Sequence, residues 1–182
     1  MSREIGGRAD KDGNEFERLW VVDQALRVLQ GKATSLQWEP AGKSSYGMEL
    51  EVTLPDGGRE VHQCKIERDL KGHWSASDLA TADVLKAAQR HLQRPGVSEF
   101  VFVSRDPAAS ALRDLVERAH RMNEDPELFF EAALSAREHQ AEILRLCKEW
   151  GLDAELASDR VQAFSLLQRI RFETGIWDQS QR

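Results

Sequence analysis

Gly47-Met48-Glu49-Leu50-Glu51-Val52 and Val61-His62-Gln63-Cys64-Lys65 flank a turn at Pro55-Asp56-Gly57-Gly58, and these three runs decide the fold. Asp-Gly between two runs of strand-forming residues is typical of a β-hairpin. Because side chains alternate across a strand, the pattern places an apolar set, with Cys64, on the core face. The same alternation gathers polar side chains on the opposite face.

The length of the loop determines which polar side chains meet. With a three-residue loop at 56–58, Glu49 is predicted to lie opposite Lys65, and Glu51 opposite Gln63. A two-residue loop would shift the register by one and separate these residues onto two faces. An acid, an amide and an ammonium on one face suit metal-assisted cleavage of a phosphodiester. The alternative is an ordinary half-exposed hairpin with a cross-strand Glu–Lys pair.

Composition limits the possible functions. The chain has 182 residues, of which 41% are hydrophobic, enough for one globular domain with a core. Its net charge of -6 argues against a uniformly basic nucleic-acid binder, so any DNA contact is expected from a local patch or through metal ions. The two cysteines form no disulfide framework or zinc motif, and no leader or membrane-length segment is apparent. We therefore expect a cytoplasmic protein that does not contact a membrane.

Apolar periodicity predicts an alternation of helices and strands. Helices are expected over 14–30, 78–92, 108–121, 126–134, 135–150 and 158–172, and strands over 34–39, the hairpin and 99–104. This order favours an α/β fold with a three-layer core. We divide the chain into a flexible arm (1–12), a core (13–121) and a C-terminal helical extension (122–182).

Three motifs in order resemble the PD-(D/E)xK restriction-endonuclease-like superfamily in its Q-x-K variant. They are the Gly-rich start and Phe-Glu of the first helix (7–17), Gly47-Met48-Glu49-Leu50, and His62-Gln63-Cys64-Lys65. The closer similarity is to DNA endonuclease effector domains of bacterial anti-phage systems, namely CD-NTase-associated endonucleases and the amino-terminal domains of STAND-type NTPases. The resemblance covers roughly residues 5–106 and is thin beyond.

The resemblance implies a restriction-endonuclease-like core, a mixed central sheet flanked by helices, and Mg²⁺-dependent (or Mn²⁺-dependent) cleavage of double-stranded DNA. It implies catalytic roles for Glu49, Gln63, Lys65 and Glu17. Metal ligands would be the Glu49 carboxylate, the Gln63 side-chain carbonyl and the Cys64 main-chain carbonyl, with waters completing the shell. Lys65 would orient the attacking water and stabilise charge on the phosphoryl oxygens. A homo-oligomer, or attachment to a sensor or NTPase domain, is also expected.

The chain departs from the family pattern at two positions. Glu49 replaces the usual aspartate, and Gln63 replaces an acid, so metal affinity should fall unless Glu17 or Glu51 supplies charge. In related Q-x-K domains the amide is compatible with cleavage. Glu17 has an alternative interpretation as a surface glutamate favoured by the helix dipole.

Candidate DNA contacts are Arg68 and Lys71 after the second strand, and a helical ridge of Lys86, Arg90 and Arg94. The alternative for the ridge is a solvated helix face. His91, His120 and His139 show no ligand spacing and are expected at the surface. Two other functions remain open: a nuclease-fold module that binds DNA without cutting it, and an assembly or adaptor domain acting through the helical tail.

Overall fold

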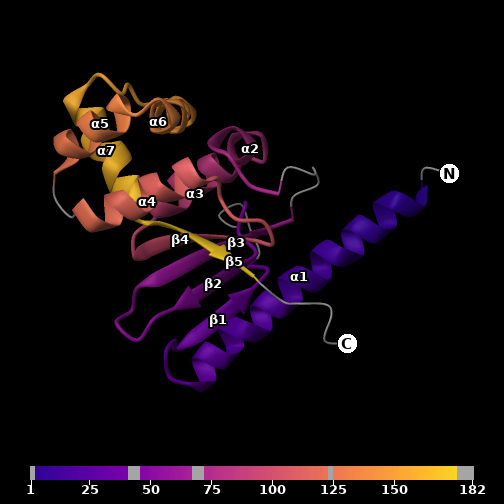
Figure 1. Ribbon diagram of the computed structural model, residues 1–182. Helices are drawn as coiled ribbons and strands as arrows, with labels where there is room; N and C mark the ends of the chain where they lie inside the picture. The colour runs from indigo at the N-terminus through magenta and orange to yellow at the C-terminus, as the bar shows by residue number, and fades with distance from the viewer. Residues whose placement is uncertain (1–2, 41–45, 67–71, 123–124, 176–182) are drawn as a thin grey trace.

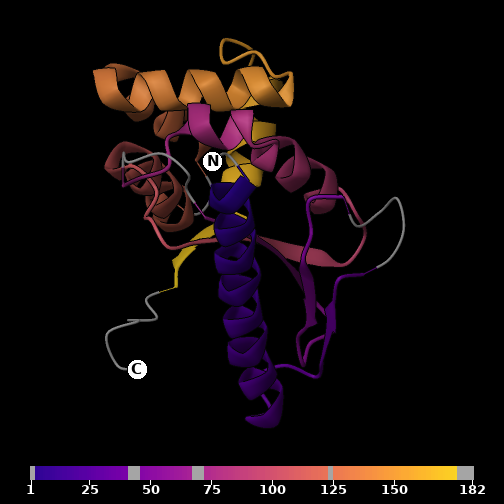
Figure 2. The same cartoon turned by 90° about the vertical axis from the view of Figure 1, so that its right-hand side faces the viewer.

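The computed structural model describes residues 3–40, 46–66, 72–122 and 125–175. The fold is α/β: a five-stranded sheet has α1 on one face and the other helices on the opposite face (Figures 1 and 2). The strands are β1 (Ser35–Trp38), β2 (Leu50–Thr53), β3 (Arg59–Lys65), β4 (Val97–Ser104) and β5 (Ile170–Thr174). The helices are α1 (Arg3–Leu29), α2 (Ala76–Thr81), α3 (Val84–Leu92), α4 (Ser110–Met122), α5 (Pro126–Ser135), α6 (Arg137–Trp150) and α7 (Ala157–Leu167).

The sheet is mixed, with strand order β1-β2-β3-β4-β5. The first three strands form an antiparallel meander, and β4 and β5 run parallel to β3. These directions bring the end of β1, the start of β2 and the ends of β3, β4 and β5 to the same side. We call this side, marked by Trp38, Leu50, Lys65, Ser104 and Thr174, the carboxyl end of the sheet.

Each face of the sheet has its own apolar core. Leu50, Val52 and Cys64 pack with Phe16 and Trp20 of α1. On the other face, Val61, Phe100 and Phe102 belong to a larger cluster formed mainly by α2 to α7. Successive residues of β3 therefore serve opposite faces, as the alternation in the sequence predicts.

The hairpin is confirmed, but its loop is longer than expected. Residues 54–58 connect β2 to β3, and Glu51 lies opposite Val61 rather than Gln63. Gly57 has φ +86°, and its N–H donates to the Leu54 carbonyl at 3.0 Å, while the Leu54 N–H donates to Gly58 at 2.8 Å. The register differs by two positions from the prediction, so the paired side chains keep the faces that the sequence assigns to them. Met48, which precedes β2, is an exception, because it packs in the larger cluster rather than with Leu50 and Val52.

Three helix boundaries differ from the sequence prediction. α1 begins at Arg3 and so includes most of the segment expected as a loose arm, 1–12. The helix expected over 78–92 is two helices, because Asp83 adopts a left-handed conformation with φ 58°. The helix expected over 158–172 ends at Leu167 and is followed by β5, which pairs with β4. Residues 122–182 are thus more than a helical extension, since they contribute an edge strand to the central sheet.

None of the helices in the described ranges combines the length and the apolarity needed to cross a bilayer.

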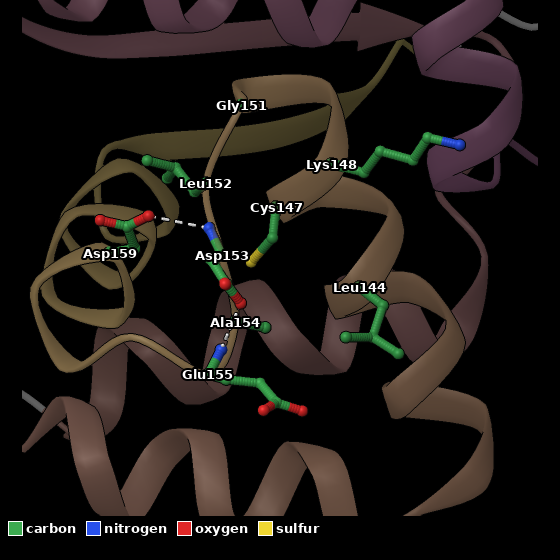
Figure 3. Close-up of a pocket in the computed structure, with 9 residues that line it drawn as sticks. All are labelled: Leu144, Cys147, Lys148, Gly151, Leu152, Asp153, Ala154, Glu155 and Asp159. Atoms are coloured by element: carbon green, nitrogen blue, oxygen red, sulfur yellow. Dashed lines mark hydrogen bonds between the residues drawn. The ribbon is translucent and has the colours of Figure 1, made fainter.

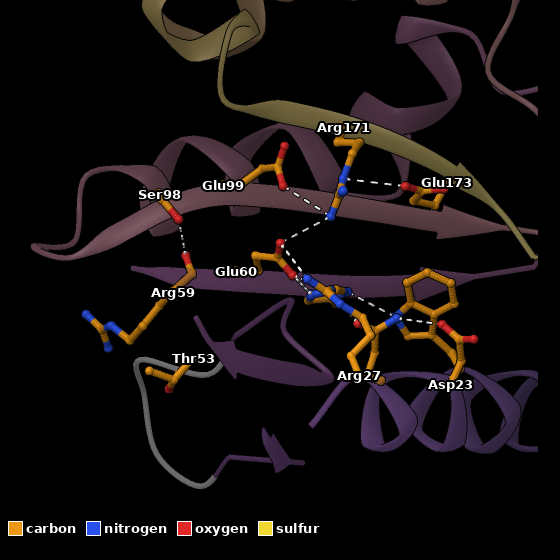
Figure 4. Close-up of polar contacts among 12 residues, drawn as sticks. Asp23, Arg27, Thr53, Arg59, Glu60, Ser98, Glu99, Arg171 and Glu173 are labelled. Atoms are coloured by element: carbon orange, nitrogen blue, oxygen red, sulfur yellow. Dashed lines mark hydrogen bonds and ion pairs between the residues drawn. The ribbon is translucent and has the colours of Figure 1, made fainter. Parts of the chain in front are cut away.

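A buried polar cluster joins α1 to the sheet, and Figure 4 shows it converging on Glu60. Arg27 of α1 donates to Glu60 at 2.6 Å, and Arg171 of β5 lies 3.4 Å from the same carboxylate. His62, which is fully buried, lies 3.3 Å from Glu60 through Nε2 and accepts from Trp20 Nε1 at 3.0 Å through Nδ1. Every charged group in this cluster has a partner, as a buried ionic group requires.

The cluster makes stability sensitive to acid. Burial alone would raise the pKa of Glu60, but hydrogen bonds from His62 and Arg27 outweigh it and lower the pKa from 4.5 to about 2. Burial lowers the pKa of His62 below 6.5, despite the opposing hydrogen bond to Glu60. Both groups bind protons more readily in the unfolded chain, so stability falls as the pH falls.

We therefore expect the free energy of unfolding to decline first below pH 6.5 and then more steeply between about pH 4.5 and pH 2. The Glu60 contribution at neutral pH is about 3 kcal/mol, from the size of its pKa shift. Urea unfolding measured at several pH values would show this, and Glu60→Gln should flatten the lower part of the profile. An unchanged profile in Glu60→Gln would contradict the assignment.

Candidate functional site

Glu49 and Lys65 meet at the carboxyl end of the sheet. Glu49 immediately precedes β2, and its N–H donates to the His62 carbonyl at 3.0 Å, which continues the pairing with β3. Its Oε2 accepts from the Cys64 N–H at 3.0 Å, and its Oε1 lies 3.6 Å from Lys65 Nζ. The structure therefore brings together the predicted acid, the predicted ammonium and the main chain of Cys64.

The surroundings of the Glu49 carboxylate disfavour its charged form. Burial raises its pKa, and the nearby charge of Glu17 raises it further. The Lys65 ammonium and the Cys64 N–H act in the opposite direction, but the pKa remains raised overall. A partly buried carboxylate with a second carboxylate close by would gain from a bound cation, because the cation would offset both the burial and the repulsion.

Glu17 projects from α1 toward this end of the sheet. Its Oε1 accepts a hydrogen bond from Trp38 Nε1 at 2.8 Å, at the end of β1. Sequence reasoning missed Trp38, and the only signal for it was its position at the end of a strand next to the polar run. The bond to Trp38 fixes the carboxylate of Glu17 near enough to raise the pKa of Glu49.

Gln63 lies on the same face of β3 as Lys65, and it is only 3% exposed. Its Oε1 is buried and accepts no hydrogen bond from the described part of the chain. A buried carbonyl oxygen without a donor is rare in folded proteins and often marks the place of a water or an ion. The amide oxygen thus retains the lone pairs that a hard cation such as Mg²⁺ requires.

Gly47 allows the chain to approach α3 closely before it enters the site. Its φ is +67°, and a Cβ at this position would lie 2.6 Å from Ala87 Cβ and 3.3 Å from Gln63 Nε2. A side chain here would push against both the helix and the candidate ligand. The glycine of the sequence motif therefore has a steric role next to Gln63.

Glu51 is not available as an additional metal ligand. It lies 3.1 Å from Arg59 and 2.8 Å from Arg94, which neutralise it. Because Arg94 pairs with Glu51, it is not free to contact DNA as part of the predicted ridge. Over the described ranges, no three or more His, Cys, Asp or Glu side chains gather in a way that could hold a metal. Any metal shell must therefore depend on Glu49, the neutral Gln63 carbonyl, the main chain and water.

The predicted DNA contacts are only partly placed. Lys86 and Arg90 are exposed on α3, where Lys86 pairs with Asp83 at 3.8 Å and Arg90 lies 5.0 Å from the centre of the Tyr46 ring. Arg68 and Lys71 lie outside the described residues.

The surface prediction was wrong for His91 and His139, which are both buried. His91 Nε2 lies 2.8 Å from the Tyr46 carbonyl, so it anchors the chain just before Gly47.

A separate cavity of about 600 Å³ lies between α6, α7 and their connection (Figure 3). Its carboxylates serve the loop itself: Asp159 accepts from the Asp153 N–H at 2.8 Å, and Asp153 accepts from the Glu155 N–H at 2.9 Å. None of the residues that line it belongs to the candidate site at the carboxyl end of the sheet.

Comparisons of the chain with protein-family models, with curated proteins and with solved structures give no match.

The buried Gln63 oxygen has no donor among the described residues, and this predicts that an apolar substitution at this position increases stability. Gln63→Leu should raise the free energy of unfolding by about 1 kcal/mol, because it removes, at similar volume, a buried acceptor that has no donor in the described part of the chain. Gln24→Leu is a matched control, because Gln24 is similarly buried but forms hydrogen bonds with Arg27 and Asp23. Loss of these bonds should lower the free energy of unfolding of the Gln24→Leu variant. Urea titration distinguishes the two variants. A loss of stability in Gln63→Leu comparable to that in Gln24→Leu would contradict this interpretation of the site.

Proposed function

We propose that this chain is a divalent-metal-dependent DNA endonuclease with a restriction-endonuclease-like core. The observation that carries the proposal is the grouping of Glu49 and Lys65 at the carboxyl end of the sheet, on the same strand pair as the Gln63 carbonyl, which has no donor among the described residues. Ligands of α/β proteins commonly bind at this end of parallel strands. The mixed sheet with helices on both faces agrees with the architecture that the sequence resemblance implies.

The residues present fit a hard divalent cation. Glu49 would supply a charged oxygen and Gln63 a neutral one, and Glu17 would hold water molecules of the metal's shell. Mg²⁺ or Mn²⁺, when bound, would polarise the scissile phosphate and lower the pKa of a coordinated water. The orphaned Gln63 oxygen supports this arrangement, because a metal would give it the partner that the described protein does not.

Lys65 has the direct role in the reaction. Its ammonium is partly exposed, and it lies 3.6 Å from Glu49, so its charge is held beside the proposed ligand. There it would orient the attacking water and stabilise the negative charge that builds on the phosphoryl oxygens. Lys86 and Arg90 of α3 would contact the DNA backbone farther from the reacting phosphate. The sequence resemblance would place such an enzyme in bacterial anti-phage defence.

A second candidate is a DNA-binding module of the same fold that does not cleave. It is favoured by the amide at position 63 and by the engagement of Glu51 with two arginines, which together leave few anionic ligands. Isothermal titration of the chain with Mn²⁺, together with the plasmid assay below, separates the two functions. DNA binding with metal uptake but no cleavage would favour the binding module.

Lys65→Ala should lower the rate of nicking of supercoiled plasmid in Mg²⁺ or Mn²⁺ by about 10²–10³-fold, because it removes charge stabilisation in the transition state. Lys148→Ala is the matched control, since it removes an exposed lysine of α6 and should leave the rate unchanged. Near-parental nicking by Lys65→Ala would exclude the proposed role of this residue.

Glu49→Gln should abolish Mn²⁺ binding and cleavage while preserving the fold. The amide keeps the size of the side chain and an acceptor for the Cys64 N–H, but it removes the one charged group that we propose as a direct metal ligand. Titration calorimetry measures the metal directly, without reference to activity. The metal site would have to be placed elsewhere if Glu49→Gln bound Mn²⁺ as tightly as the parent.

A further inference from the structure

Arg105 directly follows the candidate site on the neighbouring strand. Ser104, the last residue of β4, pairs with Lys65, the last residue of β3. The main chain of Arg105 therefore leaves the carboxyl end of the sheet next to the proposed catalytic lysine. No motif in the sequence identifies this arginine, because its proximity to Lys65 depends on the parallel pairing of two distant segments.

The side chain of Arg105 turns toward α1. Its guanidinium carbon lies 5.7 Å from the centre of the Phe16 ring, and Phe16 is buried and directly precedes Glu17. The aromatic face attracts the cation and restricts the plane of the guanidinium. Arg105 is thus held, partly buried, over the turn of α1 that carries the Glu17 carboxylate.

Arg105 also differs in its charge environment from arginines of α1 and of the sheet. Arg27 pairs with Glu60, Arg59 pairs with Glu51, and Arg171 lies within 3.5 Å of three glutamates. Arg105 has no carboxylate partner among the residues that the structure describes. A partly buried guanidinium keeps five donors in a fixed planar arrangement, which matches the oxygens of a phosphate.

We propose that Arg105 binds a backbone phosphate of the DNA, next to the phosphate that Lys65 contacts. This proposal rests on the proposed nuclease function. The charge of Lys65 is balanced by Glu49, so Lys65 adds little net attraction before the metal binds. Arg105 supplies a positive charge that no carboxylate of the described residues balances. Its two-point contact to the phosphate would fix the position of the DNA relative to Glu49 and Lys65.

The test measures binding of a short DNA duplex by fluorescence anisotropy in EDTA at several salt concentrations. Arg105→Ala should weaken binding roughly tenfold or more and lower the slope of log affinity against log salt by about one, as expected for loss of one phosphate contact. Arg105→Lys keeps the charge and should retain the parental slope with intermediate affinity, because it loses the planar donors. Arg113→Ala, which removes an exposed arginine of α4, is the control and should bind as the parent does.

The outcomes separate the two proposals. If the parent cleaves plasmid but Arg105→Ala keeps both its affinity and its salt slope, the role of Arg105 is overturned and the nuclease function stands. If Arg105→Ala does not fold, as judged by circular dichroism, an Arg105→Lys variant with parental affinity overturns the inference equally. If the parent binds no duplex in EDTA even at low salt, the role of Arg105 is overturned, and plasmid nicking in Mg²⁺ or Mn²⁺ decides the nuclease function separately.

Discussion

The alternation of side chains along β3 is the constraint on which both faces of this protein depend. Glu60, His62 and Cys64 face α1, whereas Val61, Gln63 and Lys65 face the helices of the other layer. A shift of one residue in this strand would exchange the two sets and place Gln63 and Lys65 against α1. The strand lies between β2 and β4, so its register is fixed from both sides by main-chain hydrogen bonds.

Polar groups on the two faces of β3 differ in whether they have hydrogen-bond partners. On the α1 side, Glu60 and His62 are fully partnered by Arg27, Arg171 and Trp20, and the network attaches the helix to the sheet. On the other side, the Gln63 oxygen is buried without a donor in the described protein, and Glu49 keeps a raised pKa. In the described chain, every charged group of the Glu60 network has an ionic or hydrogen-bonding partner, whereas the Gln63 oxygen has no donor, and this difference supports the ligand site that we propose.

The sequence predicted what depends on local pattern. Period-two alternation placed Glu49, Gln63, Lys65 and Cys64 on their correct faces, although the loop of the hairpin is five residues long. It did not predict β5, because Phe164, Leu167 and Ile170 continue a helical spacing and only the open edge of β4 selects a strand there. The sequence did not identify Arg105 or Trp38 as site residues, because their neighbours come from distant segments of the chain.

The position of β5 has a consequence for how the chain reaches its native state. The meander of β1 to β3 joins segments that are close in sequence, but β5 pairs with β4 across the whole run of α4 to α7. During translation, the meander and α1 can associate while the ribosome is still extending the helices. One margin of β4 stays open until residues near Phe172 have emerged, and because this pairing is so distant in sequence, we expect completion of the sheet to be a slow step that exposes an unpaired strand edge.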